Sequence, residues 1–157
     1  MAGFFGKLPT QGDFVSRGLA PGTRAWLDQW LTRWLAPYVH DPDRWPRGGI
    51  RGVLDAPSGP LVVVIGPSID RPGRDFPILA CIAADAPSRP GADRWADLAA
   101  VALARAVRGD YDADTLLAAL ETIPAPAAGE PPLPAPWLWS DSAEGPPETL
   151  LTTLFAA

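Results

Sequence analysis

Three apolar segments joined by turn residues constrain the fold of this chain most strongly. The middle one, residues 61–65, is a run of Leu, Val and Ile, which favours a buried β-strand. Residues 50–55 precede it across a turn at 57–60, and residues 76–84 follow it. Because strands joined by tight turns pair antiparallel, we predict an antiparallel sheet. The polar stretch 66–77 between the last two strands is expected to be a loop.

Helical periodicity predicts elements that cover this sheet. The clearest helix is residues 23–38, with Thr23 as its expected N-cap and Pro37 at its end. Its apolar side chains cover about half of the helix circumference: Trp26, Leu27, Trp30, Leu31, Trp34 and Leu35. We interpret this stripe as core packed on the sheet rather than as an exposed stacking platform. Further helices are predicted at 94–108, 113–122 (capped by Asp112 or Asp114) and 147–155, and residues 86–92 are expected to be a loop.

The remaining segments complete an α+β arrangement. Residues 3–15 are predicted to form a short strand, a turn and a second extended piece. The proline-rich stretch 124–136 is expected to be an extended surface loop, followed by a short edge strand at 137–139. The order of elements predicts an antiparallel sheet with helices packed against it, and 157 residues fit a single domain, 1–157.

Composition narrows the class of function. The net charge of −5 and the pI near 4.7 argue against nucleic-acid binding, which needs a basic face. We see no signal peptide and no apolar run of the roughly 20 residues that span a bilayer, so direct membrane insertion is not expected. The one cysteine, Cys81, lies in an apolar run and is expected to be a buried hydrophobe in a reducing compartment. We therefore expect a cytoplasmic protein.

Two polar motifs, residues 3–17 and 66–77, combine glycine, proline and charge beside apolar segments. Charged groups near a core must pair, so we predict a network that joins the two loops through Lys7, Asp13, Arg17, Asp70 and Arg74. Gly12 and Gly73 are expected to allow backbone conformations or close approaches that a side chain forbids. Two readings stay open: the network only holds the loops together, or the loops form an exposed edge that recognises a partner.

The hypothesis that the chain is an enzyme is less well supported than these two alternatives. It would use Ser68 as nucleophile, His40 as base and Asp70 or Asp13 as the orienting acid. The sequence around Ser68 lacks the G-x-S-x-G turn of hydrolases, and Ser68 is more simply a turn residue. One histidine and one cysteine do not make a zinc set, and there is no phosphate-binding loop, so no metal or cofactor is expected.

The motifs resemble those of a known family. FGKLPTQGDFVSR at residues 5–17, the tryptophan-rich helix, and PSIDRPGRDFP at residues 67–77 look like the TagF family of bacterial type VI secretion accessory proteins. The resemblance covers residues 3–84. It implies a longin- or profilin-like α+β fold and post-translational negative regulation through components of the apparatus, including a forkhead-associated scaffold protein. Some relatives carry a fused phosphatase domain, for which this chain is too short.

We therefore predict a non-enzymatic negative regulator of type VI secretion that binds a cytoplasmic component of the apparatus. A structural or assembly subunit and a small hydrolase using Ser68 are the alternatives. The residues predicted to contact the partner or to form the motif network are Lys7, Gln11, Gly12, Asp13, Arg17, Ser68, Asp70, Arg71, Gly73 and Arg74.

Overall fold

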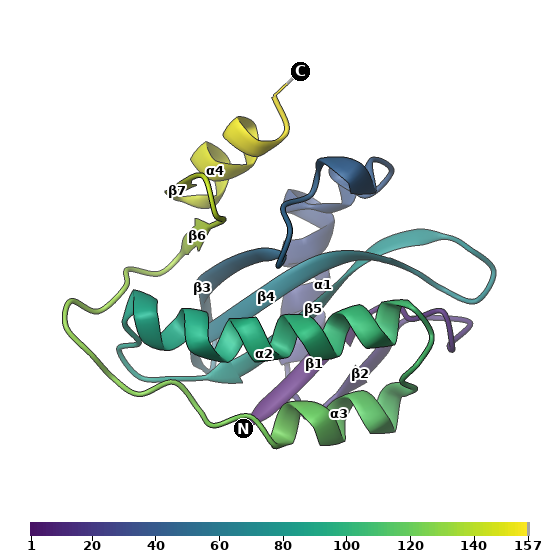
Figure 1. Cartoon of the computed structure of the whole chain (residues 1–157), viewed down its shortest axis with the longest axis horizontal. Helices are drawn as coiled ribbons and strands as arrows, with labels where there is room; N and C mark the ends of the chain where they lie inside the picture. Colours follow the sequence, from purple (N-terminus) through teal and green to yellow (C-terminus); the bar gives the residue numbers. More distant parts are fainter. Residues whose placement is uncertain (157) are drawn as a thin grey trace.

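A computed structural model describes residues 1–156, and within them seven strands form one antiparallel sheet in the order β2-β1-β5-β4-β3-β6-β7 (Figure 1). The central strands β4 and β5 are the longest, and β2, β6 and β7 have only two or three residues each. The strands are β1 (Ala2–Gly6), β2 (Val15–Arg17), β3 (Ile50–Ala56), β4 (Gly59–Ile69), β5 (Asp75–Ala83), β6 (Trp137–Trp139) and β7 (Glu144–Gly145).

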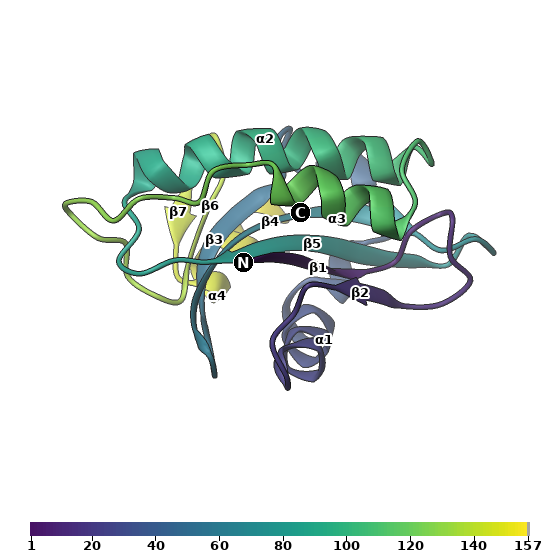
Figure 2. The same ribbon diagram turned by 90° about the horizontal axis from the view of Figure 1, so that it is seen from below.

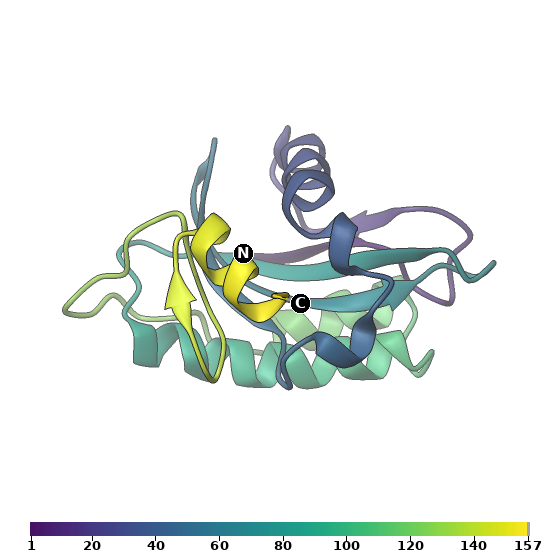
Figure 3. The same cartoon turned by 90° about the horizontal axis from the view of Figure 1, so that it is seen from above.

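Helices cover both faces of this sheet. Helices α2 (Arg89–Val107) and α3 (Ala113–Glu121) lie side by side on one face, and α1 (Thr23–Trp34) crosses the other face (Figure 2). Helix α4 (Pro147–Leu154) lies on the same side as α1, together with the 3₁₀ turns that follow α1 (Figure 3). The predicted α+β class, an antiparallel sheet with helices packed against it, is confirmed.

Coverage on both faces explains why residues 61–65 of β4 are continuously apolar. Side chains alternate between the two faces of a strand. Val62 and Val64 belong to the core beneath α2 and α3, whereas Val63 and Ile65 belong to the core beneath α1. Cys81 on β5 is buried as predicted, and burial raises the pKa of its thiol to about 12. The sheet therefore separates two hydrophobic cores.

Helix α1 confirms the interpretation of the tryptophan stripe as core. Trp30 is buried, and the rings of Trp26 and Trp34 are half-buried against the same cluster. The predicted cap was wrong: Gly22, with φ +83°, is the N-cap, and Thr23 is the first helical residue. The α-helix also ends at Trp34, before Pro37, and a 3₁₀ turn continues the chain.

Helix α2 begins five residues before its predicted start, so the predicted loop at residues 86–92 is wrong in its second half. The Ser88 hydroxyl caps the helix by accepting a hydrogen bond from the Gly91 amide at 3.2 Å. Pro90 lies in the first turn, where its missing N–H costs nothing. Asp112 caps α3 as predicted, since its carboxylate accepts from the Thr115 amide at 2.8 Å.

The C-terminal quarter extends the sheet. The proline-rich segment runs from α3 across the end of the sheet to β6, which pairs antiparallel with β3 (Figure 1). The predicted strand at 137–139 is confirmed, although β7 and not β6 forms the outermost edge. None of the helices in residues 1–156 has the length and apolar character of a membrane span.

Candidate protein-interaction site

The second motif extends a β-hairpin instead of forming a long loop. Strand β4 runs on to Ile69 and β5 starts at Asp75, so only residues 70–74 form the turn and the predicted loop at 66–77 was wrong. Pro67 and Pro77 lie directly opposite each other. Proline lacks an N–H and fits a ladder only where that N–H would point away from the partner strand. The paired prolines therefore permit the extension and remove a donor from the open edge of β4.

The two motifs meet at residues 7–12 and 70–74, which we call the junction. Asp70 lies at its centre. The Asp70 side chain is fully buried. One carboxylate oxygen is 3.1 Å from the Lys7 ammonium and accepts from the Arg74 guanidinium at 2.7 Å, while the other accepts from the Arg74 amide at 2.7 Å. A buried carboxylate needs such partners. The predicted pairing of Asp70 with Lys7 and Arg74 is thus formed.

The electrostatics of Asp70 follow from these partners. Burial by itself raises the pKa of a carboxyl group, because it disfavours the charged form. The bonds from the Arg74 amide, the Lys7 ammonium and the Arg74 guanidinium outweigh burial and lower the pKa of Asp70 from 3.8 to about 2. Asp70 is therefore ionised at neutral pH and holds both cations.

Main-chain carbonyls of the first motif accept the remaining donors of the second. The Arg71 amide donates to the Gln11 carbonyl at 2.7 Å, and the Arg71 guanidinium donates to the Thr10 carbonyl at 2.6 Å. The Arg74 guanidinium donates to the Gly12 carbonyl at 2.9 Å. These bonds link residues about 60 positions apart and fix the two turns against each other (Figure 1).

Two further contacts hold Lys7 in place on the buried side of the junction. The Ser68 hydroxyl, on the buried side of β4, donates to the Lys7 carbonyl at 2.6 Å. The Lys7 ammonium lies 5.0 Å from the centre of the Phe14 ring, which packs edge-on against Phe76. A cation over an aromatic face is attracted to it. The junction therefore rests on the α1-side core.

The structure leaves Asp13 and Arg17 outside the predicted network. The Asp13 carboxylate accepts from the neighbouring Phe14 amide at 2.7 Å and is exposed. The Arg17 guanidinium pairs with Asp114 of α3 at 3.1 Å, because β2 lies beside α3 and away from the hairpin turn. A residue's membership in a motif did not reveal which face of the strand its side chain would occupy.

The two glycines behave differently. Gly73 adopts φ +94°, a conformation that favours glycine, as predicted. Gly12 has no positive φ, and an added Cβ would meet no atom within 4 Å. The prediction for Gly12 was therefore wrong: its carbonyl contributes to the junction, and its lack of a side chain is not required.

The hydrolase arrangement is not assembled. Ser68 lies in a strand and not in the predicted turn, and its hydroxyl is used in the bond to Lys7. His40 pairs with Asp75 at 3.0 Å on the exposed surface. Within residues 1–156, no hydrogen bond joins Ser68 to His40. The part of the chain that the structure describes also holds no group of three or more metal-ligating side chains.

A second polar cluster lies where α2 begins, and sequence reasoning missed it. Asp93 accepts from the indole N–H of Trp139 at 2.9 Å and from the guanidinium groups of Arg51 and Arg89, each at 3.0 Å. Arg89 also pairs with Glu144 at 3.0 Å. Burial raises the pKa of the Asp93 carboxyl group, but these bonds outweigh burial and lower the pKa. No local pattern signals the cluster because its bonded pairs are 42 to 55 positions apart, except for Arg89 and Asp93.

Comparison with known proteins identifies the family. The chain is similar in structure to PA0076 from Pseudomonas aeruginosa PAO1, whose crystal structure was determined at 2.05 Å resolution. The TM-score is 0.64 at 25% identity, and the match covers 98% of this chain and 76% of that one. No curated protein matches this chain. The model of the TagF N-terminal domain, type VI secretion system-associated, matches residues 3–123, so the chain belongs to the TagF family.

Proposed function

We propose that this domain is a non-enzymatic, post-translational negative regulator of type VI secretion. It acts by binding a cytoplasmic component of the secretion apparatus, and a forkhead-associated scaffold protein is the first candidate. Membership in a type VI secretion-associated family supports the process, and the exposed side of the junction supports the mode of action. Inhibition follows from occupying a surface that assembly of the apparatus needs, so the amount of the domain sets the degree of repression.

The observation that carries this proposal is a rim of two exposed arginines, Arg71 and Arg74, held in a fixed position. Arg71 is exposed, and the Arg74 side chain is 62% exposed although its Nε is bound to buried Asp70. Arg71 and Arg74 are the exposed cations here, the exposed carboxylates of Asp13 and Asp75 flank them, and buried Lys7 pairs with buried Asp70. Arginine retains free N–H groups that suit carboxylates and phosphates. The two guanidinium groups of the rim therefore suit acidic side chains on the partner.

Fixed geometry matters for recognition. The Arg71 and Arg74 guanidinium groups are each bonded to a main-chain carbonyl of the other motif. Side chains that are already ordered lose less conformational entropy when a partner binds. A rim built in this way presents its charges without first having to order two loops.

Secretion in strains that lack the gene tests the proposal. Deletion is expected to raise type VI secretion, and the wild-type gene is expected to restore repression. Arg71→Glu reverses an exposed charge of the rim and is expected to restore repression poorly, because it repels an acidic partner. Arg33→Glu is the matched control, since Arg33 is an exposed arginine on α1, away from the junction.

Each outcome separates the alternatives. A fall in secretion on deletion would refute negative regulation and favour a structural subunit. Equal repression by Arg71→Glu and wild type, at equal protein levels, would show that the junction is not the contact surface. Thermal unfolding of the purified variants must accompany the secretion assay, because Arg71 also bonds to Thr10.

A further inference from the structure

The outward face of α2 carries an apolar pair between two arginines. Leu98 and Val101 are 54% and 59% exposed, whereas the opposite side of the same helix is buried on the sheet. Arg94 lies one turn before Leu98 and Arg105 lies one turn after Val101, and both arginines are exposed. At the helical repeat of 3.6 residues per turn, these four positions fall on one side of the helix.

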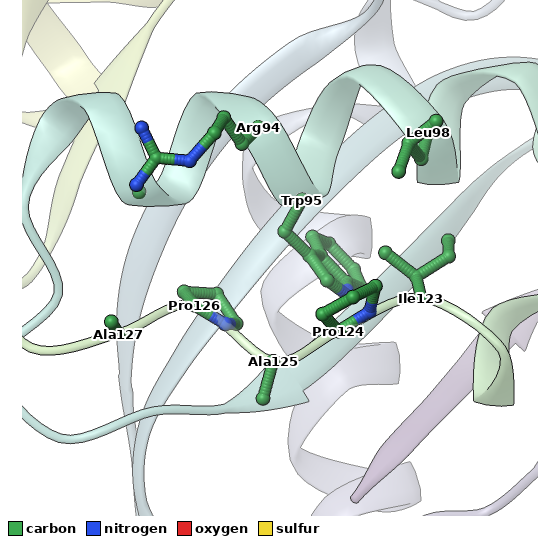
Figure 4. Close-up of a pocket in the computed structure, with 9 residues that line it drawn as sticks. Arg94, Trp95, Leu98, Ile123, Pro124, Ala125, Pro126 and Ala127 are labelled. Carbon is green, nitrogen blue, oxygen red and sulfur yellow. The ribbon is translucent and has the colours of Figure 1, made fainter.

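Two hollows meet at Leu98 in the groove between α2 and α3. One, of about 270 Å³, lies beside Arg94 and is closed on its far side by residues 123–127 (Figure 4). The other, of about 220 Å³, lies beside Val101. Leu98 and Ile123 line both, so the two hollows are neighbours along one groove. A partner can therefore bury apolar side chains on both sides of Leu98.

The charged side chains on this face of α2 are positive. Arg94 and Arg105 form no ion pair within residues 1–156, and no Asp or Glu lines either hollow. Asp97 is exposed, but its carboxylate is drawn towards β3 by a 2.6 Å ion pair with Arg51. Glu121 of α3 is exposed and lines neither hollow. A complementary surface therefore has an apolar centre with carboxylates around it.

The spacing of these residues fits a helical partner. Positions 94, 98, 101 and 105 are separated by four, three and four residues, so the pattern reads the same in both directions. A partner helix that lies along the groove in either direction can place two apolar side chains one turn apart and a carboxylate one turn beyond each. Arg94 and Arg105 are about 16 Å apart along the axis at the usual helical rise, and the same spacing in the partner brings its carboxylates beside them.

Two other occupants suit this face less well. If α2 packed on a second copy of itself, Arg94 would face Arg105 of the second copy in an antiparallel pair, or each arginine would face its equivalent in a parallel pair, and like charges repel. An anionic membrane is disfavoured because two arginines, in a chain of net charge −5, fall short of the roughly four to eight basic residues of lipid-binding clusters.

We propose that the groove between α2 and α3 binds an acidic amphipathic helix of a partner protein. The apolar side chains of that helix occupy the two hollows beside Leu98 and Val101, and its carboxylates pair with Arg94 and Arg105. No junction residue lines either hollow, so this surface is a second one and goes beyond the proposed regulatory function. Its occupancy is read on the purified domain, without reference to secretion.

Titration of the ¹⁵N-labelled domain with a designed peptide, followed by ¹H–¹⁵N NMR, tests the proposal. The alanine-based helical peptide repeats the spacing of Arg94, Leu98, Val101 and Arg105, with glutamate at the two outer positions and leucine at the two inner ones. The amide signals of α2 and α3 are expected to shift in a saturable way. A control peptide with lysine at the outer positions is expected to bind at least about tenfold more weakly, because two exposed ion pairs become repulsive.

Matched variants of the domain locate the contact. Val101→Ala is expected to weaken binding of the glutamate peptide about tenfold, because it removes apolar surface that the peptide buries. Arg105→Gln is expected to weaken it about threefold through the loss of one exposed ion pair. Ile69→Ala removes apolar surface from a 39% exposed position on the β4–β5 hairpin and is expected to leave the affinity unchanged. Thermal unfolding of each variant checks that these exposed substitutions leave the domain folded.

Three results would overturn the proposal: α2 and α3 signals that do not move with the glutamate peptide, equal affinity for the lysine peptide, or equal affinity of the wild type and Val101→Ala. Two further measurements test the other occupants. Dimerisation of the domain alone that is abolished by Val101→Ala would assign the face to a second copy. Binding to phosphatidylglycerol vesicles that is abolished by Arg94→Gln would assign it to a membrane, and either result would also overturn the proposal.

Discussion

Replacing Ser68 by alanine separates a structural role of this residue from a catalytic one. Ser68 is 5% exposed on β4, and its hydroxyl donates to the Lys7 carbonyl at 2.6 Å. Alanine removes the donor and leaves a buried carbonyl oxygen without it, which costs about 1–3 kcal/mol. The free energy of unfolding is expected to fall by that amount. For a domain of this size, each kcal/mol lowers Tm by about 2–4 °C.

Urea unfolding followed by tryptophan fluorescence measures this change, with Ser58→Ala as the matched control. Ser58 is exposed in the turn between β3 and β4, so its substitution is expected to change the free energy of unfolding by less than about 0.5 kcal/mol. In the secretion assay, Ser68→Ala is expected to repress normally when its folded amount equals that of the wild type. Equal stability of the two variants would refute the structural reasoning. Loss of repression at unchanged stability would instead favour the nucleophile hypothesis.

Two further predictions concern Asp70 and the β3–β6 pair. Asp70 has a pKa of about 2 in the folded state, below its ordinary 3.8, so its stabilising contribution is present above pH 4 and is lost as the pH falls from about 4 to 2. Asp70→Asn should flatten the loss of stability over that range, and an unchanged slope would refute the assignment. Gly52→Ala places a Cβ 2.8 Å from the Trp137 carbonyl and against Leu138, so we expect β6 to be displaced and stability to fall by about 1–3 kcal/mol. Thermal unfolding checks this, and a variant as stable as the wild type would contradict the tight contact.

The sheet was largely predictable from sequence because its strands are locally distinct. A short run of Leu, Val and Ile such as 61–65 favours a buried strand, and the turn before it favours antiparallel pairing with residues 50–55. The hairpin extension was not predictable in this way. Its residues are polar and contain prolines, and only the register, which sets Pro67 opposite Pro77, makes both prolines acceptable in a ladder.

In the candidate site, too, the contacts with a local sequence signal were predictable and the others were not. Asp70 and Arg74 are four positions apart and both lie in the tight turn, so their pairing had a local signal. Lys7 was assigned to the same network because charged groups near a core must pair, and the pairing of β1 with β5 places it beside Asp70. The misplacement of Arg17 and the missed cluster around Asp93 depend on which face each side chain takes and on the position of α2 across the sheet. Neither can be inferred from spacing alone.

Burial sorts the motif residues into two physical groups, and this affects how any variant is interpreted. Lys7, Ser68 and Asp70 are at most 8% exposed, so a partner that docks on this structure cannot contact much of them. Their substitution removes the support of the turns, and a resulting loss of regulation would report folding of the junction. Arg71 offers a charge that a partner can reach while its main-chain bond to Gln11 stays available in any variant except proline. Under the proposed function, recognition is therefore tested at Arg71, and the buried residues test whether the rim must be held in place to be recognised.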